Sequence, residues 1–369
     1  MSHSLFANRQ PDLIVIGAGH AGCEAALAAA RMGVHVLVVT PNLDRVGFMP
    51  CNPSIGGPGK SQLVAEIDAM GGAMAEVADE TALQTRRLNT SKGPAVQAIR
   101  HQVDKTLYAM VMKARLESTP GLALIQDEVT DIRLVDGQVV GVLLRHGGEV
   151  AARAVVVTAG TFLRAAMIAG ESRTSGGRAG DSADTALATS LAEIGLRTRR
   201  FKTGTPPRID GRTVDFASLT MQNSDDAPAW LSRNGAVGNI RQTWLPPSEV
   251  HAPSLRDQDG YRRIACYRTA TTADAHDIIL ANLDRAPMFN GAIEGNGPRY
   301  CPSIEDKVAR YREKDEHPVF LEPEGWRNNE FYVQGMSTSL PADVQIAVLR
   351  AIPGLAEVEV TRFGYAVEY

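Results

Sequence analysis

The pattern of apolar positions is clearest near the start of the chain. A short apolar run over residues 12–16 leads into a glycine-rich turn, an Ala-rich stretch continues to residue 32, and a β-branched run covers residues 34–40. Continuous apolar runs of this length are typical of buried parallel strands, and the Ala-rich stretch between them favours a helix. The order of strand, turn, helix and strand therefore predicts a βαβ unit.

After the βαβ unit, the order of the predicted strands is typical of a flavoprotein. Residues 122–125 and 154–158 are predicted strands, and the strands of a hairpin, 129–135 and 139–144, flank Asp136-Gly137. Residues 217–260 are rich in Pro, Asp, Ser and Asn, which predicts a loop-rich insertion. Helices are expected at 182–194, 273–284, 303–314 and 341–351. The fold class predicted is α/β, with a Rossmann-type, glutathione-reductase-like FAD-binding domain and an inserted α/β domain.

The glycine-rich turn fits the dinucleotide-binding pattern GxGxxG. Its glycines allow a tight turn, and the following helix offers unpaired N–H groups to a pyrophosphate. An acidic residue that binds the ribose 2′-hydroxyl is normally found about twenty residues further on. Here the second strand ends in Thr40-Pro41-Asn42, so Thr40 or Asn42 would have to substitute. This departure lowers the expectation of a simple NAD dehydrogenase.

Composition narrows the class of protein. The chain has 369 residues, 44% of them hydrophobic and 22% charged, which is typical of a globular protein of two to three domains. The net charge of −4 does not by itself indicate binding to nucleic acid. No signal peptide and no apolar run long enough for a membrane span are evident, which predicts a cytoplasmic protein with no membrane contact.

The four cysteines are candidates for chemistry rather than for metal binding, since their spacing fits no zinc site. Cys51 precedes a helix expected to begin near residue 58, and Cys301 precedes one begun by Ser303. A helix N-terminus stabilises a thiolate. For Cys51, a reactive thiol and a small buried apolar residue stay equally open. Cys23 and Cys266 are expected to pack in a helix and a strand.

Two stretches are locally basic. Residues 86–115 contain seven Lys or Arg against one acid, and residues 197–212 contain six against one. Clustered cations on an acidic chain suggest a polyanion site, while a solvated face or contacts with cofactor phosphates remain open.

Several long blocks resemble the MnmG family, also called GidA. The resemblance covers the chain from about residue 12, and the blocks are GAGHAGCEAALAAARMG (17–33), NLDRVGFMPCNPSIGGPGK (42–60), LNTSKGPAVQAIR (88–100), SGGRAGD (175–181), KTGTPPRIDGRTVDF (202–216), GPRYCPSIEDK (297–307), FLEPEG (320–325) and STSLPADVQ (337–345). Members are the FAD subunits of the tRNA wobble-uridine 5-carboxymethylaminomethyl modification enzyme.

The resemblance implies a chemistry and a set of partners. It implies FAD, NADH and 5,10-methylenetetrahydrofolate, which together serve to add an aminomethyl or carboxymethylaminomethyl group to C5 of uridine 34 in the anticodon of tRNA. It implies a homodimer that forms a heterotetramer with the GTPase MnmE. It also implies that Cys51 and Cys301 are catalytic, one of them adding to C6 of the uracil ring.

The resemblance also implies cofactor-binding residues. FAD contacts fall on Gly17, Ala18, Gly19, His20, Ala21, Gly22, Val129 and Asp184. Position 184 is usually serine in the family, which sets Asp184 apart. The stretch tied to NAD is Gly297, Pro298, Arg299, Tyr300, Cys301, Pro302, Ser303, Ile304, Glu305, Asp306, Lys307, Val308, Ala309, Arg310 and Tyr311.

The same resemblance predicts how the chain is divided. Residues 1–200 are expected to form the first part of the FAD-binding domain, 201–355 the inserted domain with the NAD-linked segment, and 356–369 the start of the return to the FAD domain. The family continues beyond residue 369, so the chain is expected to lack the C-terminal helical domain. The alternatives are a folate- and FAD-dependent tRNA 5-methyluridine methyltransferase, and a non-catalytic fragment that binds tRNA or a partner.

Overall fold

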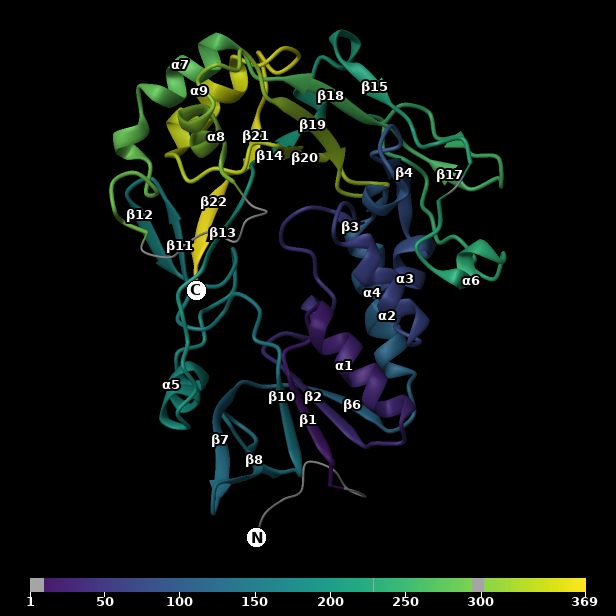
Figure 1. Cartoon of the computed structure of the whole chain (residues 1–369), viewed down its shortest axis with the longest axis vertical. Coiled ribbons are helices and arrows are strands. Elements are labelled where there is room, and N and C mark those ends of the chain that lie inside the picture. The colour runs from purple at the N-terminus through teal and green to yellow at the C-terminus, as the bar shows by residue number, and fades with distance from the viewer. Residues whose placement is uncertain (1–9, 228, 294–301) are drawn as a thin grey trace.

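The computed structural model describes residues 10–227, 229–293 and 302–369. At one end of the molecule lies a parallel sheet in the order β10-β1-β2-β6 (Figure 1). Its strands are β1 (Leu13–Ile16), β2 (Val36–Thr40), β6 (Leu122–Gln126) and β10 (Ala154–Val157), and helix α1 (His20–Arg31) connects β1 to β2. Ile14 is fully buried and pairs with Leu37 on one side and Val155 on the other. The predicted βαβ unit is confirmed.

A three-stranded antiparallel sheet lies beside this unit. It contains β7 (Val129–Val135), β8 (Gln138–Leu144) and β9 (Gly148–Ala151). Asp136 and Gly137 both have positive φ angles, 51° and 74°, as a two-residue hairpin of type I′ requires. Ile132 and Val142 join Ile14 in one apolar core, which also includes Leu187 of helix α5 (Ala186–Glu193). The predicted hairpin is confirmed.

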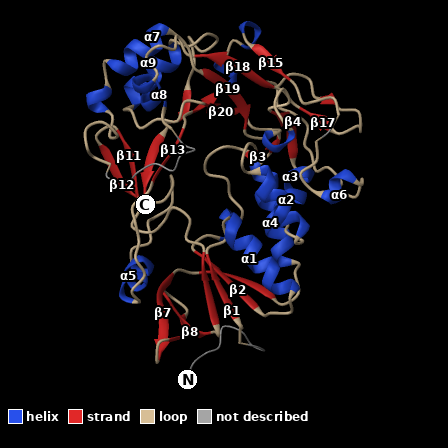
Figure 2. Cartoon of the chain, in the orientation of Figure 1, coloured by secondary structure: helices blue, strands red, loops and turns tan. Residues whose placement is uncertain are grey.

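A column of helices and a small sheet rises from α1. Helices α2 (Ser61–Ala69), α3 (Met74–Glu80) and α4 (Lys105–Glu117) run along one side of the molecule (Figure 2). Above them is a sheet in the order β3-β5-β4, formed by β3 (Ser54–Gly56), β4 (Ala82–Leu88) and β5 (Ala98–Val103). Tyr108 and Met112 of α4 are fully buried in the same core as Cys23 of α1.

The far end of the molecule is built on a six-stranded antiparallel sheet in the order β15-β18-β19-β20-β14-β21. Its strands are β14 (Arg208–Asp210), β15 (Thr220–Gln222), β18 (Cys266–Ala270), β19 (Pro318–Pro323), β20 (Glu330–Gln334) and β21 (Val360–Arg362). The helices that pack with it are α7 (Ala273–Leu280), α8 (Ile304–Arg310) and α9 (Ala342–Arg350). Figure 2 shows these three helices grouped at one side of the sheet.

A four-stranded sheet, called the joining sheet below, lies between the two ends of the molecule. Its order is β12-β11-β22-β13, with strands β11 (Ala166–Ala169), β12 (Ser172–Ser175), β13 (Lys202–Thr205) and β22 (Tyr365–Glu368). The last strand, β22, therefore pairs with one strand on each side of the boundary predicted at residue 200. The predicted domain boundaries remain predictions.

Some predicted helices are too long. The structure gives 186–193, 273–280 and 304–310 where 182–194, 273–284 and 303–314 were expected. Asp184 accepts a hydrogen bond from the N–H of Leu187, which places it ahead of α5 rather than within it. The predicted loop-rich insertion contains β15, helix α6 (Arg233–Ala236) and strand β16 (Leu255–Arg256), which pairs with β17 (Arg262–Arg263). Among the described residues, no helix is both long and apolar enough to cross a bilayer.

Candidate functional site

The glycine loop between β1 and α1 contains three glycines with different roles. A Cβ on Gly17 would lie 2.6 Å from the carbonyl oxygen of Thr158, and one on Gly22 would lie 1.9 Å from the carbonyl oxygen of Gly17. These two glycines allow the loop, α1 and β10 to pack closely. A Cβ on Gly19 would meet nothing within 4 Å. The backbone at Gly19 is thus open to a ligand at the start of α1.

A cavity of about 300 Å³ begins at this loop. It is lined by the ends of β1, β2 and β10, by the segment 127–129 and by the segment 178–184. Among the residues predicted to bind FAD, the cavity brings together Gly17, Ala18, Gly19, Val129 and Asp184. His20, Ala21 and Gly22 lie in the first turn of α1 and do not line it. Burial raises the pKa of the Asp184 carboxyl.

Residues at the end of β2, where the dinucleotide-binding pattern normally has an acidic residue, line one part of the cavity. Thr40, Asn42 and Arg45 all line it. The Asn42 side chain accepts a hydrogen bond from the N–H of Asp44, so its oxygen helps to shape the loop. The Arg45 guanidinium lies 4.6 Å from the ring centre of Phe48. Substitution for the missing acid by Thr40 or Asn42 stays a prediction.

His20 is the first residue of α1 and packs edge-on against Tyr108, with 5.6 Å between the ring centres. Its Nδ1 is buried and has no hydrogen-bond partner among the described residues. Burial lowers the pKa of His20 to about 4, because the charged form would lose water without gaining a partner.

This histidine predicts a pH dependence of stability. Below pH 6.5 the unfolded chain protonates His20, while the folded chain does not until about pH 4. The unfolded state then binds more protons, so the free energy of unfolding should fall as the pH drops from 6.5 to 4. Urea unfolding of the wild type and His20→Gln at pH 7 and pH 5 measures this contribution. An equal loss of stability in both proteins would contradict it.

Cys51 lies in the loop that precedes β3, against one strand of the joining sheet and one strand of the six-stranded sheet. Its Sγ is 3.2 Å from the hydroxyl oxygen of Tyr332 on β20 and 3.7 Å from the carbonyl oxygen of Gly204 on β13. The predicted stabilisation of its thiolate by a helix N-terminus is wrong. Helix α2 begins only at Ser61, after β3 and a turn, and the contacts of the thiol are made with strands.

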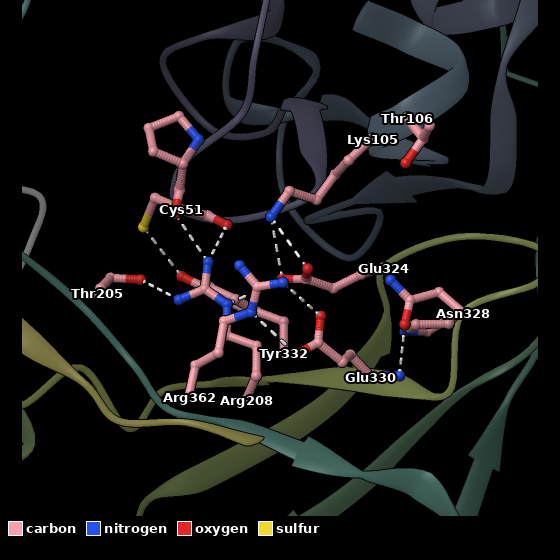
Figure 3. Close-up of polar contacts among 12 residues, drawn as sticks. Cys51, Lys105, Thr106, Thr205, Arg208, Glu324, Asn328, Glu330, Tyr332 and Arg362 are labelled. Carbon is pink, nitrogen blue, oxygen red and sulfur yellow. Dashed lines mark hydrogen bonds and ion pairs between the residues drawn. The ribbon is translucent and has the colours of Figure 1, made fainter. Parts of the chain in front are cut away.

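Arg208 fixes the backbone around Cys51 (Figure 3). Its Nη2 donates to the carbonyl oxygens of Pro50 and Cys51, at 2.8 and 2.9 Å. Its Nη1 donates to the hydroxyl of Thr205 at 2.6 Å, and its Nε to Glu324 at 2.9 Å. Arg208 is only 4% exposed, so all of these bonds form away from water. The guanidinium therefore acts as a clamp that joins the Cys51 loop to β14.

Glu324 connects this clamp to helix α4. Its carboxylate accepts from Arg208 and, through both oxygens, from Lys105 at 3.1 Å. Burial lowers the pKa of Lys105, and the charge of Glu324 opposes that shift. Beside it, Arg100 pairs with buried Glu322 at 2.7 Å. Sequence reasoning missed these residues as a site, because it took Lys105 and Arg208 only as members of basic segments.

The second predicted catalytic residue, Cys301, lies outside the described residues, as do Gly297, Pro298, Arg299 and Tyr300. The described remainder of the NAD-linked segment belongs largely to the packing of α8. Ile304 and Val308 are buried in the core, and Glu305 accepts hydrogen bonds from the N–H and hydroxyl of Ser339. The side chain of Lys307 donates to the carbonyl of Gly335.

The other cysteines are buried. The Cys23 thiol donates to the carbonyl of Ala18 at 3.4 Å, and burial raises its pKa to about 12. Burial also raises the pKa of Cys266, whose thiol lies 3.4 Å from the side-chain oxygen of Gln84. The predicted packing roles of both are confirmed.

Many cations of the two basic segments are buried or paired within the chain. Lys202 is only 2% exposed, so it cannot present its side chain to a polyanion. Most of the other cations form ion pairs within the chain: Arg86, Arg100, Lys105, Lys113, Arg115, Arg200, Arg208 and Arg212. Binding of a polyanion by the exposed cations of these segments, such as Arg199, stays a prediction, in which buried Lys202 has no part.

Comparison with known proteins agrees with this architecture. The family model for glucose inhibited division protein A matches residues 12–369. The tRNA uridine 5-carboxymethylaminomethyl modification enzyme MnmG of Chloroflexus aurantiacus is 50% identical over 366 residues, covering 97% of this chain and 56% of the relative. The enzyme of the same name from Bacillus mycoides is 49% identical, covering 97% of this chain and 54% of the relative.

A solved structure extends the likeness to three dimensions. The GidA structure from Aquifex aeolicus superimposes with a TM-score of 0.87 at 41% identity, over 99% of this chain and 56% of that one. The α/β class and the Rossmann-type arrangement are thereby confirmed. The chain spans little more than half the length of these relatives. Since the family model and these relatives match almost every residue, the chain belongs to the glucose-inhibited division protein A family, GidA or MnmG.

Proposed function

We propose that this chain is the flavin-binding and thiol-bearing part of an enzyme that modifies the wobble uridine of tRNA. The observation that carries the proposal is the cavity at the glycine loop, which opens at Gly19 and includes Val129 and Asp184. The names of the relatives, tRNA uridine 5-carboxymethylaminomethyl modification enzymes, supply the reaction. The chain covers part of their length, so the whole reaction belongs to the proposal.

The residues present fit FAD. The first turn of α1 has no acidic residue, and no side chain among the described residues caps its N–H groups. These groups and the open backbone at Gly19 would hold the pyrophosphate. Thr40, Asn42 and Arg45 would face the ribose or phosphate, and Val129 and Asp184 would contact another part of the cofactor. Bound FAD supplies two-electron redox chemistry to the site.

Cys51 would carry the covalent chemistry on the uridine. Its sulfur adds to C6 of the uracil ring, and the C5–C6 double-bond electrons move so that C5 becomes the nucleophile. After C5 has gained its substituent and lost its proton, the S–C6 bond breaks and the thiolate leaves. Arg208 holds the Cys51 backbone in place through these steps, because it binds the carbonyls of Pro50 and Cys51.

The proposal extends to the reactants and partners that the family resemblance implies. 5,10-Methylenetetrahydrofolate is the one-carbon source and NADH the reductant, with the segment 297–311 and the second thiol of Cys301 taking part. The partners are the anticodon region of tRNA and the GTPase MnmE, in a heterotetramer built on a homodimer in the cytoplasm. Nucleoside mass analysis of tRNA from a deletion strain separates modification of uridine 34 from 5-methyluridine formation.

Flavin binding by a Gly19→Ala variant tests the cavity. A Cβ at this position meets no protein atom but projects to where the pyrophosphate would bind, so FAD affinity should fall by about tenfold or more. The loss of helix stability from this N-cap change should stay near 1 kcal/mol. Flavin absorbance after dialysis and equilibrium titration with FAD measure the effect.

Gly93→Ala is the matched control. Gly93 is also a cap glycine with nothing within 4 Å of its added Cβ, but it does not line the cavity. This variant should bind FAD like the wild type. If Gly19→Ala held FAD as tightly as Gly93→Ala, the cofactor would have to bind elsewhere.

A further inference from the structure

The thiol of Cys51 lies between two oxygens of different character. On one side, the Gly204 carbonyl oxygen at 3.7 Å can only accept a hydrogen bond. On the other, the Tyr332 hydroxyl at 3.2 Å can donate or accept. If the S–H points to the carbonyl, the sulfur is left as an acceptor facing Tyr332.

The surroundings of Tyr332 favour donation by its hydroxyl. Tyr332 is 3% exposed, and Cys51 is the hydrogen-bond partner that the described residues give to its hydroxyl. A buried O–H group is nearly always directed at an acceptor, and the acceptor within reach here is the sulfur. Figure 3 shows the hydroxyl and the thiol facing one another above β20.

Tyr332 also keeps its proton. Burial raises its pKa well above the ordinary value, so the hydroxyl remains a donor throughout the range in which a thiol titrates. The ring is held by the Arg208 guanidinium, 5.0 Å from the ring centre. The charged groups near the thiol and the Tyr332 hydroxyl are Arg208 from β14, Lys105 from α4, Arg100 from β5, Glu322 on β19 with Glu324 just after it, and Lys202 further along β13.

We propose that Tyr332 is a positioning residue for Cys51, whose hydroxyl donates a hydrogen bond to the sulfur and stabilises it as the thiolate. Such a bond strengthens when the acceptor becomes charged, so it favours the nucleophilic form and, later, the thiolate as leaving group. No proton passes to or from Tyr332 in this role. The inference rests on the proposed function in one respect only, which is the reaction in which the thiolate takes part.

The test is the pH profile of Cys51 alkylation in the whole chain, with wild type and Tyr332→Phe compared. Iodoacetamide is the probe, and peptide mass spectrometry separates Cys51 from the other cysteines. In Tyr332→Phe, the midpoint of the rate profile should rise by about one pH unit, with an about tenfold lower rate below the midpoint. The rate at high pH should be unchanged, since the thiolate is then formed in both proteins.

Tyr365→Phe is the matched control. It removes a hydroxyl that accepts a bond from the N–H of Ala179, away from the thiol, and should leave the profile unchanged. If the midpoint of the alkylation profile of Tyr332→Phe equals that of the control, the proposal is overturned. A midpoint below that of the wild type would show that the thiol was the donor, which also overturns the proposal. The readout needs neither flavin nor tRNA, so it stands apart from any failure of the proposed function.

Discussion

Replacing Cys51 with serine is expected to lower wobble-uridine modification by about 10³-fold or more while FAD remains bound. A serine hydroxyl is far less ionised than a thiol at neutral pH, and the groups that contact the sulfur, the Gly204 carbonyl and the protonated Tyr332 hydroxyl, are not bases that could activate it. The cofactor cavity does not include Cys51, so flavin content should be unaffected. Nucleoside mass spectrometry of tRNA from a deletion strain carrying the variant gene measures the loss.

Cys266→Ala provides the control for this substitution. Cys266 is buried on β18 and contacts Gln84, away from the cavity and from Arg208. Its replacement should leave modification largely intact. Normal modification by the Cys51→Ser enzyme would remove Cys51 from the catalytic role and leave it as a packing residue.

The second large effect concerns stability. Replacing Glu324 with glutamine should lower the free energy of unfolding by about 3–5 kcal/mol, the usual cost of removing one partner of a buried ion pair. Glu324 is the carboxylate that Lys105 and Arg208 share, and all three side chains are at most one-tenth exposed. Its loss leaves two buried cations facing one another with a neutral amide between them. Urea unfolding followed by circular dichroism gives the difference.

Glu330→Gln is the comparison for this measurement. Glu330 also pairs with an arginine, but the side chain of Arg362 is 62% exposed, and water can replace the lost partner. The expected loss is about 1 kcal/mol or less. A similar loss in both variants would mean that the Lys105–Glu324–Arg208 cluster contributes no more than a surface pair.

The loop from which the cavity opens could be predicted from the sequence because most of its determinants are local. Gly17 and Gly19 lie within one strand–turn–helix segment, and the apolar runs on either side fix that segment as a βαβ unit. The hairpin was equally local, since Asp136 and Gly137 adopt the positive φ angles that their turn requires.

The surroundings of Cys51 could not be predicted in the same way. The surroundings of the thiol are formed by Gly204, Arg208 and Tyr332, which are far away in sequence. They come together only when β13 of the joining sheet and β14 and β20 of the far sheet approach the loop before β3. A pattern within a short window predicted a helix dipole instead. Charge counting could not find the Lys105–Glu324–Arg208 cluster for a related reason: a count does not distinguish a cation paired with a distant carboxylate from one that faces solvent.

The position of β22 has a consequence for the order of folding. This strand lies between β11 and β13, and residue 366 pairs with residues 168 and 204, so both ladders close long loops of chain. Loop-closure entropy makes such distant pairings slow to form. The βαβ unit and the hairpin can form from neighbouring residues as the chain leaves the ribosome, whereas this sheet must wait for residues 365–368. We therefore expect the join between the two ends of the molecule to be made late, after each end has begun to form its own core.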